Sequence, residues 1–349
     1  MGKQVVYIRK KIRKTPYILF YIYLLFALLC IFTVASYTWF TLSWSPQVNG
    51  MNVYITSNMG LELAPTRDAK VWSNQLNLYS TEELEKYADS ELKPPLRQTT
   101  WSDTDQCFYG PLYGYDGRLL DIAKRDAEDR PVISWYKLED LIHANSLSSS
   151  NYYIKATFYA RCGQPAAVML AEPMPVDNQG TQGAGTYVIG DPNTGKGPET
   201  AVRVGFRITQ VDPNLSVEED PESGPMIVYE PNSDRHVDGS MDPISTYSVD
   251  GFFSAGTDEI PLVPNDRLIR QTFSKKGELG YFLENPTLFE IKTGEVMKIE
   301  LYIWLEGQDV DCSNAMSDGN TTTRIEANIQ FTGTSESQSG MQPIPKSKE

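Results

Sequence analysis

Two acidic segments hold the residues best suited to chemistry at a site. Each gathers side-chain oxygens on one short stretch: "GQDVDCSNAMSDGN" offers Asp309, Asp311, Asn314, Asp318 and Asn320, and "SDRHVDGSMD" offers Asp234, Asp238 and Asp242. Oxygen ligands gathered on a loop suit calcium, although neither segment has EF-hand spacing. The candidate calcium ligands are therefore Asp309, Asp311 and Asp318. Solvated turn acids are the commoner explanation of such segments, and that alternative stays open.

The two histidines give little support for catalysis. His143 lies in "LEDLIHAN" and His236 in the second acidic segment. The sequence has no HExxH and no paired-histidine spacing, which argues against a zinc hydrolase. A Ser-His-Asp triad is assembled in space, and no local motif indicates one. We therefore predict a protein that is not an enzyme, with no catalytic and no cofactor-binding residues.

Two glycine-rich stretches resemble nucleotide-binding motifs only in part. "GDPNTGKG" at 190–197 approaches a Walker A loop, but Gly197 stands where Ser or Thr is needed and Pro198 follows where a helix should begin. "GTQGAG" at 180–185 lacks the spacing of a dinucleotide fingerprint and has no helix after it. Both stretches are predicted to be turns or loops.

An aromatic segment is the main candidate for ligand or partner binding. "CFYGPLYGYDGR" at 107–118 places four rings among glycines, and the candidate contact residues are Tyr109, Tyr113 and Tyr115. Aromatic side chains exposed on a loop can stack on sugars or anchor a partner. The alternative is a lid that folds back onto the core.

In the segments that must position these residues, apolar and polar residues alternate with period two. Long runs at 151–162, 201–211, 296–307 and 324–333 place apolar and polar residues on opposite sides, with Arg203 and Trp304 on the polar sides. Such half-polar strands belong to antiparallel sheets with one wet face. Shorter strand candidates follow the same pattern, at 51–57, 59–64, 166–172, 226–230 and 247–254.

The fold class follows from these strands: mainly β, an antiparallel β-sandwich with long loop insertions. Only one or two short helices are expected, at 80–90 and 136–147. No strand–helix–strand alternation favours a parallel nucleotide-binding sheet. Loops are predicted at 89–130, 173–200, 211–224 and 231–245, and the polar tail 334–349 is predicted to be disordered.

The N-terminus predicts export. A basic head at 1–16 precedes an uncharged run whose 19 residues, 17–35, would form a helix about 29 Å long, the thickness of a bilayer core. We assign 17–36 to this transmembrane or signal helix. The basic flank stays inside, so the domain at 37–333 is expected outside the cell.

Charge is very uneven along the chain. All 45 acidic residues and 25 of the 31 basic ones follow residue 14, so this part carries a net charge of about −20. A surface of this sign repels phosphate and argues against nucleic acid as a partner.

Whether the helix is cleaved stays open. Thr33, Val34 and Ala35 offer a small-x-small site just before Ser36, which would release the protein, while the length of the apolar run favours a membrane anchor. Cysteines add little: Cys107, Cys162 and Cys312 permit one internal disulfide and leave an odd thiol, and buried unpaired cysteines are at least as plausible.

Three stretches carry a family resemblance: "TWFT" directly after the apolar run, "VRVGFRITQ" at 202–210 and "IELYIWLEGQDVDCSNA" at 299–315. The chain resembles the exported TasA and camelysin group of Gram-positive bacteria, which a SipW-type signal peptidase handles. The resemblance implies a jelly-roll-like sandwich. It also implies, for some members, assembly into extracellular fibres through an N-terminal strand. Camelysins are also described as metal-dependent proteases, an activity that no pattern here supports.

These patterns give two functional expectations. The first is a non-catalytic, outward-facing structural element of the cell surface or biofilm matrix, held by the membrane or released, which assembles through its N-terminal strand. The alternative is an extracellular module that binds a glycan or a protein. An enzyme ranks third.

Overall fold

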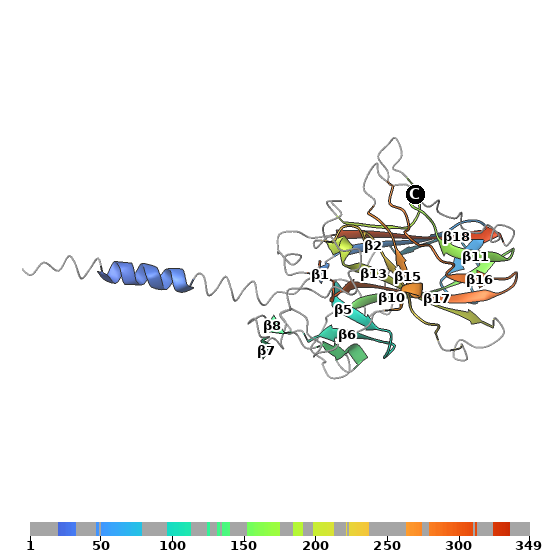
Figure 1. Cartoon of the computed structure of the whole chain (residues 1–349). Coiled ribbons are helices and arrows are strands. Elements are labelled where there is room, and N and C mark those ends of the chain that lie inside the picture. The colour runs from blue at the N-terminus through green and yellow to red at the C-terminus, as the bar shows by residue number, and fades with distance from the viewer. Residues whose placement is uncertain are drawn as a thin grey trace, which may run out of the picture. The chain divides into compact units, whose positions relative to one another are not determined.

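The computed structural model describes most of the β-rich part of the chain (Figure 1). The described residues are 20–32, 47–48, 50–78, 96–112, 124–125, 131–132, 135–139, 152–174, 184–190, 198–212, 221, 223–236, 263–273, 279–309, 311–312 and 324–335. The chain divides into two compact units, Met1–Trp44 and Ser45–Glu349. All described strands belong to the second unit.

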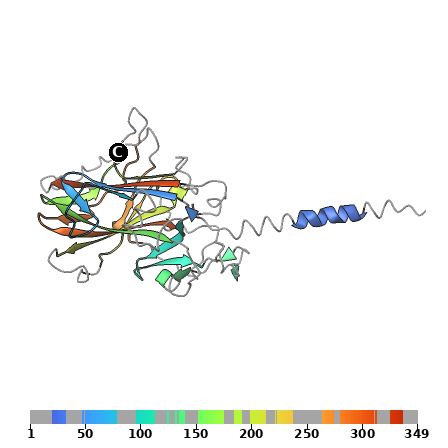
Figure 2. The ribbon, with the colours of Figure 1, turned by 180° about the vertical axis from the view of Figure 1, so that it is seen from behind.

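The second unit is mainly β and contains two large sheets. In the first sheet the strands follow the order β15-β14-β13-β17-β5-β6-β9, and β1, β3 and β10 pair with strands of this sheet outside that order. In the second sheet the order is β16-β11-β18-β2-β4, and β12 pairs with β18 outside that order. Figures 1 and 2 show β2 and β18 in one layer and β10 and β17 in the other. The pair β7 (Lys124–Arg125) and β8 (Pro131–Val132) stands apart, and η1 (Pro198–Thr200) and η3 (Asn265–Arg267) are short 3₁₀ helices.

The strands of the two large sheets have the following bounds. The first sheet contains β1 (Gln47–Val48), β3 (Leu61–Ala64), β5 (Leu96–Ser102), β6 (Cys107–Pro111), β9 (Trp135–Lys137), β10 (Tyr153–Cys162), β13 (Val202–Val211), β14 (Ile227–Glu230), β15 (Leu268–Arg270) and β17 (Val296–Glu306). The second contains β2 (Gly50–Ser57), β4 (Gln75–Leu78), β11 (Ala166–Leu170), β12 (Tyr187–Gly190), β16 (Phe289–Ile291) and β18 (Arg324–Ser335).

The main core lies between the two sheets. The Phe331 ring of β18 packs against Phe158 of β10 and Phe206 of β13, with ring centroids 6.1 and 5.8 Å apart. Over most of β10 and β18, buried apolar residues alternate with less buried residues, as predicted for 151–162 and 324–333. Two sheets joined by interdigitated inner faces fit a β-sandwich.

The prediction of wholly antiparallel sheets was wrong, because both large sheets are mixed. Parallel pairs join β18 to β2, β14 to β15 and β17 to β5. The period-two pattern cannot reveal this, because a half-buried strand alternates in the same way whichever direction its neighbour runs. The β2–β18 pair also joins the two ends of the unit, so no hairpin fixes its direction.

A second core covers the opposite face of the first sheet, where a wet face was predicted. Trp304 and Tyr302 of β17 are buried there, together with Trp101 of β5 and Phe108 of β6. The Phe108 ring centroid lies 5.0 Å from that of Trp101 and 5.4 Å from that of Trp304. The segment 89–130 was predicted to be a loop, yet it supplies β5 and β6, which cover β17 on its second face.

Several local predictions differ from the structure in where an element begins or ends. Residues 135–137 form β9 and residues 138–139 are helical, so the predicted helix at 136–147 begins two residues later than expected. Residues 140–147, the helix at 80–90 and the strand at 247–254 lie outside the described residues. The strand β18 extends to Ser335, into the predicted tail. Cys30, Cys107, Cys162 and Cys312 are all free, and burial raises the pKa of the Cys312 thiol well above its usual value.

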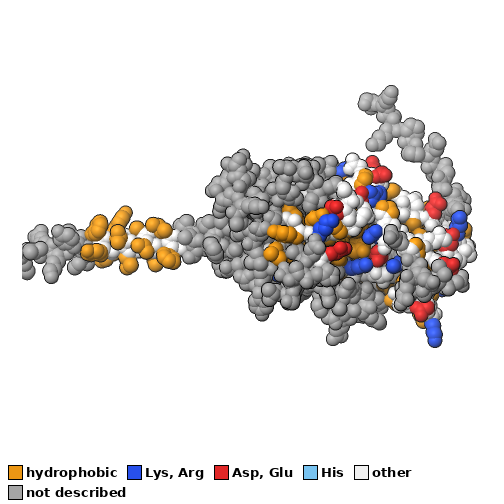
Figure 3. All heavy atoms as spheres, turned by 90° about the horizontal axis from the view of Figure 1, so that it is seen from below, with side chains coloured by type: hydrophobic (Ala, Val, Ile, Leu, Met, Phe, Trp, Pro, Cys, Tyr) orange, Lys and Arg blue, Asp and Glu red, His pale blue; other side chains and the backbone are white. Residues whose placement is uncertain are grey.

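The first unit is described at residues 20–32, which form a helix. Figure 3 shows apolar side chains around this helix, and those of Phe20 through Phe32 are exposed. Within the described part of the chain, no helix has the length and apolarity needed to cross a bilayer. The flanking residues of the predicted 17–36 segment, including Ala35 and Ser36, lie outside the described residues, so the nature of this segment stays a prediction.

Candidate functional site

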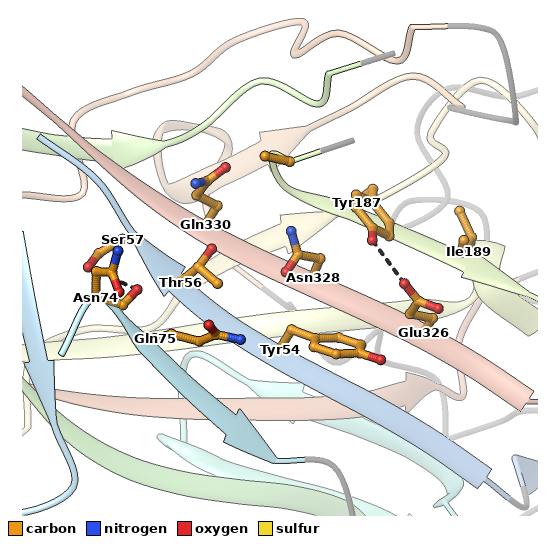
Figure 4. Close-up of a pocket in the computed structure, with 11 residues that line it drawn as sticks. Tyr54, Thr56, Ser57, Asn74, Gln75, Tyr187, Ile189, Glu326, Asn328 and Gln330 are labelled. Atoms are coloured by element: carbon orange, nitrogen blue, oxygen red, sulfur yellow. Dashed lines mark hydrogen bonds between the residues drawn. The ribbon is translucent and has the colours of Figure 1, made fainter. Parts of the chain in front are cut away.

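A polar pocket of about 570 Å³ lies on the outer face of the second sheet (Figure 4). Four strands, β4, β2, β18 and β12, supply most of its wall. The lining residues are Tyr54, Thr56, Ser57, Asn74, Gln75, Ala184, Tyr187, Ile189, Glu326, Asn328 and Gln330. Nine of these eleven carry a hydrogen-bonding side chain, so the pocket suits a polar ligand.

Strand alternation explains why these side chains face outward. On β2 the inward positions Val53 and Ile55 are buried in the core, which leaves Tyr54 and Thr56 on the outer face. On β18, buried Ala327, Ile329 and Phe331 alternate in the same way with outward-facing residues. A sequence pattern that is ordinary for a wet strand thus builds the pocket floor.

The strand register brings the outward side chains into rows across the sheet. One row joins Tyr54 of β2, Asn328 of β18 and Tyr187 of β12. The next joins Gln75, Thr56 and Gln330. Figure 4 shows these side chains side by side above the strands. Residues opposite one another on neighbouring strands have β-carbons about 5 Å apart, so adjacent members can contact one ligand.

The interruption between β11 and β12 shapes the end of the pocket. Both β11 and β12 pair with β18 along the same edge, β11 as far as Leu170 and β12 from Tyr187. Between them the chain leaves the sheet and returns through Gly185, whose φ is +112°. A β-carbon at this position would lie 2.2 Å from the Glu172 carbonyl oxygen, so the return requires glycine.

Buried amides hold β12 from its far edge. Gln271 Nε2 donates to the Thr186 carbonyl at 2.9 Å, and Asn232 Nδ2 donates to the Val188 carbonyl at 3.1 Å. Both amide side chains are almost fully buried. They satisfy carbonyls that a neighbouring strand would otherwise pair, and they fix the strand that carries Tyr187.

Among the described residues that line the pocket, Glu326 is the one with a charged side chain. Glu326 accepts a hydrogen bond from the Tyr187 hydroxyl at 2.9 Å, drawn as the dashed line in Figure 4. None of the described lining residues is Lys or Arg. The electrostatic character of the pocket is therefore neutral to weakly negative.

A second candidate site is a buried charge cluster at one end of the first sheet. Arg203 of β13 and Glu230 of β14 meet His236, Asp309 and Asp311 from the segments that follow β14 and β17. His236 Nδ1 lies 2.7 Å from Asp311 Oδ2, and its Nε2 lies 3.2 Å from Glu230 Oε1. Arg203 Nη2 donates to Asp309 Oδ2. All five side chains are nearly inaccessible to solvent.

The charges of this cluster are mutually compensated. Burial lowers the pKa of His236, but the surrounding carboxylates Asp309, Asp311 and Glu230 outweigh it and raise that pKa to about 11. Burial raises the pKa of Asp309, but Arg203 and His236 reverse this and hold it below its usual value. At neutral pH the cluster therefore contains an imidazolium and a guanidinium beside the ionised carboxylate of Asp309.

The predicted calcium site coincides in part with this cluster. Asp309 and Asp311 do come together, and ligand atoms of His236, Asp309 and Asp311 lie within 4.8 Å of one another. Asp318 lies outside the described residues. Asp234 of the other acidic segment accepts a hydrogen bond from the Phe273 backbone instead. Because protonated His236 and Arg203 already offset most of the negative charge of the three carboxylates, the geometry favours a structural ion network over a cation site.

The aromatic segment 107–118 begins with strand β6 (Cys107–Pro111). Tyr109 lies in β6, and its hydroxyl donates to Asp105 Oδ2 at 2.8 Å. Burial and this hydrogen bond raise the pKa of Tyr109. Tyr113 and Tyr115 lie outside the described residues, as does His143. Tyr109 is thus engaged with neighbouring side chains of its own hairpin, away from the pocket.

Sequence reasoning missed the pocket and found the charge cluster only in part, through Asp309 and Asp311. The pocket residues carry no local motif, and Arg203 was predicted on a wet face although it is fully buried. One signal was available for the cluster: Glu230 ends the otherwise apolar strand β14, a position where a carboxylate is often held by partners.

No family model, no curated protein and no solved structure matches this chain. Function is therefore inferred from the chemistry of the pocket and of the charge cluster.

Proposed function

We propose that this protein is a glycan-binding module and that it binds its ligand in the pocket on β2, β4, β12 and β18. One observation carries the proposal: rows of amide, hydroxyl and phenol side chains line a pocket of ligand size on a rigid sheet. Sugar hydroxyls donate and accept hydrogen bonds, and Asn and Gln side chains also do both. Side chains on strands are held more precisely than side chains on loops.

The lining disfavours other ligand classes. Phosphate groups and nucleic acids are bound by Lys and Arg, which the described lining lacks. Lipids and apolar cofactors need mostly hydrophobic walls, whereas only Ala184 and Ile189 of this lining are aliphatic. The partly exposed ring of Tyr54 adds apolar surface of the kind that can pack on the face of a sugar ring.

The cellular setting is part of the proposal and rests on the sequence. The basic head and the apolar run at 17–35 support an outward-facing protein, anchored or released after Ala35. The other expectation, a matrix element of the TasA and camelysin kind with a jelly-roll-like strand order, depends on assembly through residues 36–44. Those residues lie outside the described part of the chain, and the pocket favours the binding module.

Substitutions in the pocket test the proposal. The purified full chain is titrated calorimetrically with a panel of soluble neutral oligosaccharides. Tyr54→Ala and Gln330→Ala are each expected to weaken the affinity for the bound sugar about three- to tenfold, the loss of one ligand contact worth about 0.5–1.5 kcal/mol. Tyr281→Ala and Gln210→Ala are matched controls, because both residues are exposed and outside the pocket.

The proposal fails if the full chain binds no member of the panel. It also fails if the two control variants weaken binding as much as the two pocket variants do, since the sugar would then bind elsewhere.

A further inference from the structure

We infer that Glu326 makes this pocket select against acidic glycans, so that its ligands are uncharged or amine-bearing sugars. The inference rests on the proposed function, because it names the ligand class of the same pocket. Its starting point is position: Glu326 pairs with Ile189 of β12 and lies two residues before Asn328, on the outward face of β18. The carboxylate therefore belongs to the same wall as the amides and phenols.

In the described part of the chain, Glu326 forms no ion pair. Its Oε1 accepts the Tyr187 hydroxyl at 2.9 Å, and within the described residues no Lys or Arg forms an ion pair with it. Other sheet-face glutamates differ: Glu300 pairs with Lys155 at 3.0 Å and Glu62 with Arg161 at 2.7 Å. Among the residues that the structure describes, the carboxylate of Glu326 in the pocket therefore has no cation that compensates its charge.

A carboxylate without a paired cation attracts some ligands and repels others. It accepts hydrogen bonds from sugar hydroxyls and attracts an ammonium group, since a carboxylate is an acceptor and carries a negative charge. A uronic acid or another anionic sugar would place a second negative charge within a few ångströms. Like charges at that separation repel, and such repulsion is a common source of binding specificity.

Tyr187 keeps this carboxylate in place. Its ring is almost fully buried, and its strand is fixed by Gln271 and Asn232 from the far edge. A carboxylate held in one position discriminates more sharply than one that can turn away from an unfavourable ligand.

Matched sugars test the inference. The full chain is titrated with neutral hexose oligosaccharides, with the corresponding uronic acid oligosaccharides and with the corresponding 2-amino-2-deoxy oligosaccharides. The uncharged and amine-bearing forms are expected to bind at least about tenfold more tightly than the acidic form at low ionic strength. Added salt is expected to reduce this ratio.

Two variants separate Glu326 from the general negative charge of the protein. Glu326→Gln keeps an acceptor for the Tyr187 hydroxyl and is expected to lose most of the discrimination. Glu290→Gln removes one charge from an exposed position of β16 in the same sheet, outside the pocket, and is expected to keep the wild-type ratio.

The possible failures are distinguishable. Equal binding of neutral and acidic sugars by the wild type, or unchanged discrimination in Glu326→Gln, overturns the inference and leaves the proposed function standing. Equal loss of discrimination in Glu290→Gln also overturns it, because net charge would then be the cause. Failure to bind any sugar of the three classes removes the proposed function, and the inference with it.

Discussion

Replacing Arg203 with methionine is expected to lower the free energy of unfolding by about 3–5 kcal/mol, because it removes one partner of a buried ion network. The Arg203 side chain is fully buried, and Nη1 also donates to the carbonyls of Thr200 and Val202 at 2.8 and 2.9 Å. Without the guanidinium, Asp309 loses a directly bonded cation, and Glu230 loses a positive charge 3.9 Å away. Neither carboxylate can reach water to recover the lost interaction.

A matched surface substitution provides the comparison. Arg161 pairs with Glu62 at 2.7 Å, but the two side chains are 45% and 47% exposed. Exposed pairs contribute about 0–1 kcal/mol, so Arg161→Met should lower the free energy of unfolding far less in urea titrations of the full chain. The double variant Arg203→Met with Asp309→Asn should cost less than the sum of the single changes. Equal costs for Arg203→Met and Arg161→Met would contradict a buried network.

The outward-facing strands were the predictable part of the fold. Alternation at 324–333 located β18 and assigned Ile325, Ile329 and Phe331 to the core side, where all three are buried. Alternation at 151–162 did the same for β10. These predictions held because each strand has one face in the main core and another that is at least partly open, which is the situation that period two encodes.

The central strands were only half predictable. For β13 and β17 the correct period was present, but the polar-looking side was buried as well, with Arg203 and Trp304 among the least exposed residues of the chain. What covers that side comes from distant segments, among them β5 and β6, and from ion pairing. A single strand's pattern contains neither the covering segment nor the partner charge.

The candidate pocket lay beyond sequence reasoning for a similar reason. Tyr54, Gln330 and Tyr187 each occupy an ordinary outward position on a strand, and none belongs to a motif. They become neighbours only because β2 pairs in parallel with β18 while β12 pairs with the other edge of β18. The register of non-local strands places them together, and the local pattern does not encode that register.

His236 is expected to make the protein less stable as pH rises. Its pKa is about 11 in the folded chain against about 6.5 in an unfolded one. Between these values the folded state binds one proton more than the unfolded state. The contribution is therefore complete below about pH 6.5 and is lost as pH rises toward 11, by up to about 1.4 kcal/mol per pH unit. The lowered pKa of Asp309 acts in acid, below this window.

The protonation of His236 can be followed directly, apart from any change in folding. In full chain labelled with ¹⁵N-histidine, the His236 ring is expected to keep the signals of an imidazolium at pH 8, where an ordinary histidine is neutral. The variant His143→Gln leaves one histidine and so assigns the signal. In urea titrations between pH 6.5 and 9, His236→Gln should show a shallower fall in the free energy of unfolding than the wild type, because glutamine does not titrate. A His236 ring that titrates near pH 6.5 would show that the carboxylates around it do not hold the proton.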